Sequence, residues 1–296
     1  MSKERTDSLA TAETGHVQLP GYRLQRLIAA SSRYEVFQAW SEERSVPVAL
    51  KLARPSAGEV AGEKLLDEGR ILAGLTHPNL LRLYELEPGS IPGLVLELLT
   101  GPSIADLFDI TDALPYGDVV EMGRQVAAGV GYLHRCGWLH GDIKPGNVIA
   151  DQGGKAVVID LSLARPPGRY EPKFGTQGYL APEQADCRPV SEATDVWGLG
   201  MLMLESASGR DGFPPGCPEY RMEHGPIAAP PSRRFPRGVP DEFVELIMKC
   251  TAFDPADRPS LSEVFGALNE LAATGRDDKR QGWLGKLSSR VVSPNR

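Results

Sequence analysis

The side chains best equipped for chemistry lie in one short run, His140-Gly-Asp-Ile-Lys-Pro-Gly-Asn147. The run offers a carboxylate at Asp142, an ammonium at Lys144 and an amide at Asn147, and Asp160 follows eighteen residues after Asp142. Carboxylate and amide oxygens at neighbouring strand ends can share a hard cation such as Mg²⁺. Such a set suits phosphoryl transfer, because catalysis of that reaction is mostly positioning and charge neutralisation.

These residues need strands and helices to hold them in place. Apolar residues that alternate or run continuously between turn signals predict one helix at 61–75 and strands at 22–28, 35–40, 47–52, 81–87 and 93–98. Further along, apolar spacing predicts helices at 118–136, 195–208, 241–251 and 260–272, the first capped by Asp118. A strand pair at 148–150 and 156–159 flanks an Asp-Gln-Gly-Gly turn. A small β-rich unit thus joins a larger helical unit near 97–101, and a cleft between two such units is a common ligand site.

Four further motifs stand in order around the first run: Val48-Ala-Leu-Lys51, Gly175-Thr-Gln-Gly-Tyr-Leu-Ala-Pro-Glu183, Thr194-Asp195-Val-Trp-Gly-Leu-Gly200 and Asp257-Arg258-Pro259. Together the motifs resemble the eukaryotic-like (Hanks-type) serine/threonine protein kinases over about residues 22–271. The resemblance implies an α+β, bilobal protein-kinase fold, with an antiparallel N-terminal β-sheet carrying one helix and a mostly helical C-lobe. The kinase domain would span 21–272, with the N-lobe at 21–99 and the C-lobe at 100–272. The Arg-, Ala- and Pro-rich composition favours a bacterial member.

The resemblance assigns the chemistry of ATP and Mg²⁺ to these side chains. Lys51 would bind the α- and β-phosphates of ATP and pair with Glu68. Asp142 would be the catalytic base that orients the substrate hydroxyl, and Lys144 would steady the γ-phosphate. The two Mg²⁺ ligands would be Asn147 and Asp160.

A second group of residues would serve substrate docking and architecture. The segment 175–183 resembles the peptide-docking end of the family's activation segment. Its Gly175-Thr176 pair, together with Lys144, is typical of members that phosphorylate Ser or Thr, which favours a protein substrate with a Ser or Thr acceptor over one with a Tyr acceptor. Two architectural features are also implied. Arg258 would form an ion pair with Glu183, and Asp195 would lie on the helix that anchors the loop carrying Asp142.

The adenine ring would lie among apolar side chains near the joint between the lobes. Matching the motifs places Val36, Ala49 and Ile149 around the ring and Leu96 at the entrance to the back pocket. Backbone groups from Glu97 to Leu99 would meet the edge of the base. Without the motif frame, these apolar residues are typical of an ordinary core.

Three departures from the family pattern bear on activity. Ala29, Ser31 and Tyr34 stand where the phosphate loop G-x-G-x-x-G has its glycines, so Tyr34 either covers the phosphates or hinders ATP. Asp160-Leu-Ser replaces D-F-G and keeps the carboxylate. Gly141 replaces the arginine that in the family contacts a phosphate on the activation loop.

The activation loop agrees with the third departure. Residues 163–173 contain no Ser or Thr, and their one hydroxyl belongs to Tyr170. We therefore expect an activity that Ser/Thr phosphorylation of this loop does not control. A pseudokinase, which binds nucleotide or acts as a scaffold, is the alternative that the glycine-free loop favours. The enzyme is favoured by the retention of the required side chains: Lys51, Glu68, Asp142, Asn147 and Asp160.

Composition narrows the partners and the location. The net charge of −7 argues against a general nucleic-acid binder. Residues 1–20 predict a flexible leader, and 273–296 a basic, disordered tail with weak contact to a membrane surface or a partner as the alternative. No apolar run is long enough for a transmembrane segment. The four cysteines form no CxxC pair, so reduced thiols and a cytoplasmic protein are expected.

Overall fold

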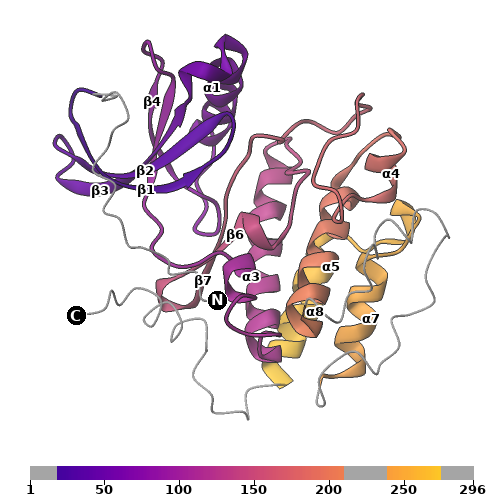
Figure 1. Ribbon diagram of the computed structural model, residues 1–296. Coiled ribbons are helices and arrows are strands. Elements are labelled where there is room, and N and C mark those ends of the chain that lie inside the picture. Colours follow the sequence, from indigo (N-terminus) through magenta and orange to yellow (C-terminus); the bar gives the residue numbers. More distant parts are fainter. Residues whose placement is uncertain (1–18, 210–238, 275–296) are drawn as a thin grey trace, which may run out of the picture.

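The computed structural model describes residues 19–209 and 239–274, which form two lobes (Figure 1). The N-terminal lobe is built on a five-stranded antiparallel sheet in the order β1-β2-β3-β5-β4. Its elements are β1 (Tyr22–Ala30), β2 (Tyr34–Ser41), β3 (Val46–Ala53), β4 (Leu83–Glu87), β5 (Gly93–Glu97) and the helix α1 (Glu59–Ala73).

Strand β3 shows how alternating side chains shape this lobe. Val48 and Leu50 point to one face of the sheet, where they are fully buried in a small apolar core. Ala49 and Lys51 point to the other face because successive side chains of a strand alternate. Ala49 there joins the main core together with Leu65 of α1. One face of β3 therefore stabilises the lobe, and the other presents Lys51 to the space between the lobes.

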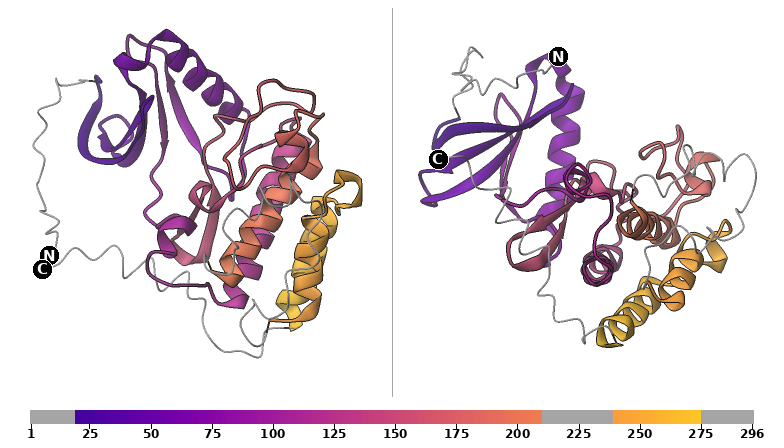
Figure 2. Two further views of the ribbon diagram at one scale, coloured as in Figure 1. Left: turned by 45° about the vertical axis from the view of Figure 1, so that its right-hand side comes forward. Right: turned by 60° about the horizontal axis from the view of Figure 1, so that its bottom comes forward.

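The C-terminal lobe is mostly helical, with its long helices side by side (Figure 2). Every residue of α5 from Thr194 to Ala207 is buried, and the stretch from Val196 to Leu204 is apolar on all sides, which is typical of a helix enclosed in the core. Backbone bonds between Val158 and both Asn79 and Leu81 tie the hairpin of this lobe to the N-terminal lobe. The elements are α2 (Ile104–Leu107), α3 (Tyr116–Arg135), β6 (Val148–Asp151), β7 (Lys155–Val158), α4 (Pro182–Ala185), α5 (Glu192–Ser208), α7 (Asp241–Cys250) and α8 (Leu261–Thr274).

This architecture confirms the predicted bilobal protein-kinase fold. Every predicted strand and long helix is present, and the largest shift moves the start of α5 from 195 to 192. The predicted Asp118 cap is wrong, since α3 begins at Tyr116 after Pro115 and Asp118 lies buried in the first turn. An acidic residue there still complements the positive end of the helix dipole. The four-residue helices α2 and α4 were not predicted, because so short a segment shows no periodicity.

Some predictions fall outside the described residues. Residues 1–18 and 275–296 hold most of the predicted leader and tail, so the domain boundaries stay predictions. Within 19–209 and 239–274, no helix combines the length and the apolar character that crossing a membrane requires.

Candidate active site

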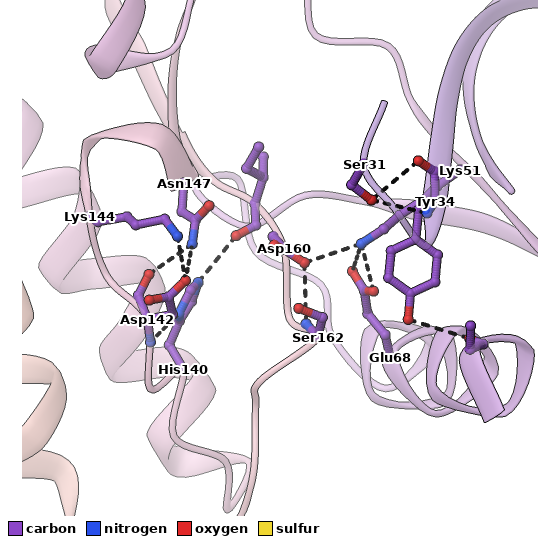
Figure 3. A network of polar contacts seen from close by, with 12 residues as sticks. Ser31, Tyr34, Lys51, Glu68, His140, Asp142, Lys144, Asn147, Asp160 and Ser162 are labelled. Atoms are coloured by element: carbon purple, nitrogen blue, oxygen red, sulfur yellow. Dashed lines mark hydrogen bonds and ion pairs between the residues drawn. The ribbon is translucent and has the colours of Figure 1, made fainter. Parts of the chain in front are cut away.

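Lys51 connects the two lobes through ion pairs (Figure 3). Its Nζ donates to Glu68 Oε1 and Oε2 at 2.9 and 2.7 Å, and to Asp160 Oδ1 at 3.1 Å. Burial alone would lower the pKa of Lys51, but the two carboxylates outweigh burial and raise that pKa. Lys51 is therefore a firmly charged cation whose position both lobes fix.

The two acids differ in their electrostatic surroundings. Burial would raise the pKa of Asp160, but attraction to Lys51 outweighs burial and lowers that pKa. Burial raises the pKa of the deeper Glu68, because desolvation there exceeds the attraction of Lys51. Asp160 also has a left-handed backbone with φ +63°, which few residues other than glycine adopt. Strain of this kind concentrates at functional sites, and it aims Asp160 toward the cleft that this residue lines.

A second polar group surrounds Asp142. Its Oδ2 accepts from Lys144 Nζ at 2.7 Å and from Asn147 Nδ2 at 3.1 Å, and its Oδ1 accepts from the backbone N–H of Thr176 at 2.9 Å. Lys144 Nζ also donates to Thr176 Oγ1 at 2.5 Å. Both predicted catalytic residues therefore meet the predicted metal ligand Asn147 and the predicted docking residue Thr176 in one network, although Thr176 lies 34 residues after Asp142. Asp160, the other predicted metal ligand, bonds to Lys51 instead.

A buried carboxylate of α5 holds the loop at 140–147, which carries Asp142 and which we call the catalytic loop. Asp195 accepts from the backbone N–H groups of His140 and Gly141, both at 2.8 Å, and lies 2.7 Å from His134 Nε2. Burial would raise the pKa of Asp195, but the hydrogen bond and charge of His134 lead the contacts that lower it. These bonds set the path of the backbone just before Asp142.

An ion pair holds the far end of the activation segment. Arg258 donates to Glu183 through Nη1 and Nη2 at 2.7 and 2.9 Å, and both side chains are fully buried. Thr194 Oγ1 donates to the same carboxylate at 2.8 Å. Gln184, which the sequence analysis did not name, donates to the carbonyl of Gly141 at 2.8 Å and links this segment to the catalytic loop.

Apolar side chains line most of a cavity of about 370 Å³ between the lobes. This volume lies within the range of small-molecule sites. All residues predicted for adenine line it: Val36, Ala49, Leu96, Glu97, Leu99 and Ile149. Ile28, Leu81 and Ile159 also line the cavity but were not predicted, because an apolar residue in a strand is typical of core.

The polar end of the cavity fits a triphosphate with Mg²⁺. Lys51, Asn147 and Asp160 all line it. Asp160 Oδ1 accepts from Lys51 and from the backbone of Ser162, and among the described residues nothing donates to its Oδ2. Asn147 donates through Nδ2, which leaves its Oδ1 as an acceptor. Mg²⁺ is usually held by one or two such side chains together with phosphates and water.

The loop at 29–34, which has no glycine, forms its turn without the positive φ angles that favour glycine. The turn between β1 and β2 is held by Ser31, whose Oγ accepts from the backbone N–H of Arg33 and of Tyr34 at 3.2 and 3.0 Å. No residue from 29 to 34 has a positive φ. Ala29, Ser31 and Tyr34 all line the cavity, so the loop still covers it.

Phe174 lies against the position where the family arginine is missing. Gly141 has φ +75°, and a Cβ built on it would lie 2.7 Å from Phe174 Cε2. The guanidinium of Arg165 lies 3.5 Å from the centroid of the Phe174 ring and 4.8 Å from that of Tyr170. We call Arg165, Tyr170 and Phe174 the aromatic clamp. The clamp was not predicted, because its only signal in the sequence is the absence of a side chain at Gly141.

Comparison with known proteins agrees with this geometry. A family model described as protein kinase domain matches residues 22–267. The serine/threonine-protein kinase PkaA of Streptomyces coelicolor is 33% identical over 218 residues, which cover 71% of this chain and 40% of that protein. The serine/threonine-protein kinase PknA of Mycobacterium tuberculosis is 30% identical over 273 residues, which cover 88% of this chain and 63% of that protein.

A third relative extends the same pattern. The serine/threonine-protein kinase PknL of Mycobacterium bovis is 30% identical over 262 residues, which cover 85% of this chain and 65% of that protein. The chain spans between about two fifths and two thirds of the length of these three relatives. The family match includes both lobes and every site residue described above. The chain therefore belongs to the protein kinase domain family, and the three relatives named here are serine/threonine-protein kinases of bacteria.

Proposed function

We propose that this chain transfers the γ-phosphate of Mg²⁺-ATP to Ser or Thr hydroxyls of a protein substrate. The observation that carries the proposal is the hydrogen-bonded group of Asp142, Lys144 and Thr176. Asn147 donates to Asp142 and lines the cavity between the lobes together with Lys51 and Asp160. The relatives PkaA, PknA and PknL are serine/threonine-protein kinases by name, which supports the same reaction here.

Asp142 is the residue that orients the substrate hydroxyl and accepts its proton. Three donors fix its carboxylate, so Asp142 presents one orientation to an incoming hydroxyl. A base held in this way contributes about 10²- to 10⁴-fold to a reaction. Thr176 belongs to the docking segment, and its bonds to Asp142 and Lys144 connect peptide binding to the base.

Two lysines supply positive charge to the phosphates. Lys51 binds the α- and β-phosphates, and Glu68 and Asp160 keep its ammonium in place. Lys144 lies next to Asp142 and steadies the γ-phosphate where the hydroxyl attacks. Mg²⁺, bound by Asn147 and Asp160, would neutralise charge on the phosphates. Fixed positive groups of this kind are the largest source of catalysis in phosphoryl transfer.

The activation segment takes its active form without a Ser/Thr phosphate. The aromatic clamp holds the guanidinium of Arg165 against two rings, and Gly141 has no side chain to offer, so neither position supplies a free cation for a loop phosphate. Tyr170 Oη donates to the carbonyl of Pro166 at 2.7 Å, which folds the loop onto itself. Residues 163–173 contain no Ser or Thr to modify.

The test of the activity is transfer from Mg²⁺-ATP to a generic basic protein by the purified chain. We expect phosphoserine or phosphothreonine in the product, by phosphoamino-acid analysis. The pseudokinase alternative has one observation in its favour, the ring of Tyr34 near Lys51. Binding of Mg²⁺-ATP with no transfer would establish that alternative and reject the proposal.

The test of loop control uses the same assay after phosphatase treatment. We expect full activity from protein that mass spectrometry shows to be free of phosphate in residues 163–173. A loop phosphate whose removal abolishes activity would reject this part of the proposal and leave the phosphotransfer itself standing.

A further inference from the structure

Tyr34 lies at the polar end of the cleft, where the family pattern has a glycine. Tyr34 and Val36 are two residues apart on β2, so they point to the same face of the sheet, and both line the cavity. The centroid of the Tyr34 ring lies 5.2 Å from Lys51 Nζ. This distance is within the range of a cation–π contact.

The phenol of Tyr34 also reaches the helix α1. Its hydroxyl donates to the carbonyl of Ala61 in the first turn of α1 at 3.4 Å. That distance is long for an O–H···O bond, so the ring contributes more than the hydroxyl. Figure 3 shows the ring between Lys51 and the helix. Tyr34 therefore contacts Lys51 through its ring and, through its hydroxyl, the helix that carries Glu68.

The strand pairing and the turn fix where the ring lies. Ser31 N donates to the carbonyl of Tyr34 at 2.8 Å, which closes the β1–β2 turn next to the ring. On the other side of β2, Tyr34 pairs with Ala53 of β3, and Arg54 N donates to the carbonyl of Arg33 at 2.8 Å. The ring is thus set by two neighbouring strands and not by a free loop.

We propose that Tyr34 is a positioning residue that holds Lys51 and α1 in their phosphate-binding arrangement before the nucleotide arrives. The inference rests on the proposed role of Lys51 as the phosphate ligand. A glycine-rich loop would bind phosphate oxygens with its backbone. In this chain the side chain of Tyr34 acts instead, by contacting Lys51. The opposite role, in which Tyr34 obstructs the phosphates, predicts that removing the ring improves nucleotide binding.

A double-mutant cycle on the nucleotide-free chain tests the contact without using activity. We expect Tyr34→Leu to raise the unfolding equilibrium constant about tenfold in the wild type but only about twofold beside Lys51→Met. Tyr34→Phe keeps the ring and should retain this coupling to Lys51. The matched control is Tyr84 on β4, which pairs with Arg82 and not with Lys51. Tyr84→Leu should have the same effect in both backgrounds.

The kinetic test separates positioning from packing. Because Lys51 binds phosphate in the ground state as well as in the transition state, Tyr34→Leu should raise KM for Mg²⁺-ATP about tenfold and leave kcat within about twofold. Tyr34→Phe should restore KM. A lower KM in Tyr34→Leu, or equal effects of Tyr34→Leu in both Lys51 backgrounds, would overturn the inference. If the wild type transfers no phosphate, the proposed function fails, while the cycle still decides whether Tyr34 acts on Lys51.

Discussion

Gly141→Ala tests whether Phe174 occupies the space of the missing arginine. Gly141 has φ +75°, and an L-residue in the left-handed region costs about 1–2 kcal/mol. The new Cβ would lie 2.7 Å from Phe174 Cε2, and overpacking of this kind costs about 1–3 kcal/mol. Phe174 cannot withdraw freely, because Arg165 covers its ring and Tyr170 meets it edge-on. Together these effects predict a loss of about 2–5 kcal/mol in the free energy of unfolding.

Gly137→Ala is the matched control for this substitution. Gly137 follows α3 with φ +86°, and a Cβ there meets nothing within 4 Å. Gly137→Ala should therefore lose only the free energy of unfolding that backbone strain costs, about 1–2 kcal/mol. The difference between the two variants measures the collision with Phe174.

Urea unfolding followed by tryptophan fluorescence gives both values. Gly141→Ala should also be made in a Phe174→Leu background, where the colliding ring is absent. There the alanine should lower the free energy of unfolding only as much as Gly137→Ala does in the wild type. If Gly141→Ala and Gly137→Ala destabilise the chain equally, to within about 0.5 kcal/mol, Phe174 does not fill the place of the arginine. A phosphate-independent activation segment would then have no structural basis.

Three further outcomes follow from single contacts. Arg258→Met leaves Glu183 buried without its partner and should cost about 3–5 kcal/mol in urea unfolding, and a cost under about 1 kcal/mol would contradict the ion pair's importance. Thr176→Val removes an acceptor of Lys144 and should lower kcat about 10- to 100-fold with KM for Mg²⁺-ATP unchanged, whereas Thr176→Ser should recover most of kcat. Burial raises the pKa of Cys250 from 9.0 to about 12, so the unfolded chain ionises first, and the stability that the neutral thiol contributes is complete below pH 9 and is lost as pH rises to 12. Across that range the wild type should lose more unfolding free energy than Cys250→Ala, and parallel losses would reject the assignment.

The sequence predicted those parts of the fold that local periodicity encodes. Alternation in β3 and helical spacing in α3 identified both elements, because each buries one regular face. Helix ends were predicted less well, since the N-cap of α3 is Pro115, three residues before the predicted cap at Asp118. The end of a helix depends on one or two residues, whereas its interior repeats a pattern.

Those site residues that belong to sequence motifs were predicted. Those that reach the site only through tertiary contacts were not. Lys51, Asp142 and Asp160 have fixed spacings to their motifs. In the structure Lys51 and Asp160 line the cavity between the lobes, and Asn147, which also lines it, donates to Asp142. The aromatic clamp has no such spacing, because Phe174 meets Gly141 only after the chain folds back on itself. The effect of Tyr34 also needed coordinates, since the sequence shows a bulky residue in the loop but not the direction of its ring.

The rate of phosphate transfer from Mg²⁺-ATP in Asp142→Asn tests the central claim most directly. Asp151→Asn is the matched control, because Asp151 ends β6 and accepts from the backbone of Thr100 and Gly101 instead of joining the catalytic network. Asp142→Asn should lose at least about 100-fold in rate while it still folds and binds Mg²⁺-ADP, and Asp151→Asn should stay within about twofold of the wild type. A folded Asp142→Asn variant that transfers phosphate at the wild-type rate would contradict the assignment of Asp142 as the base.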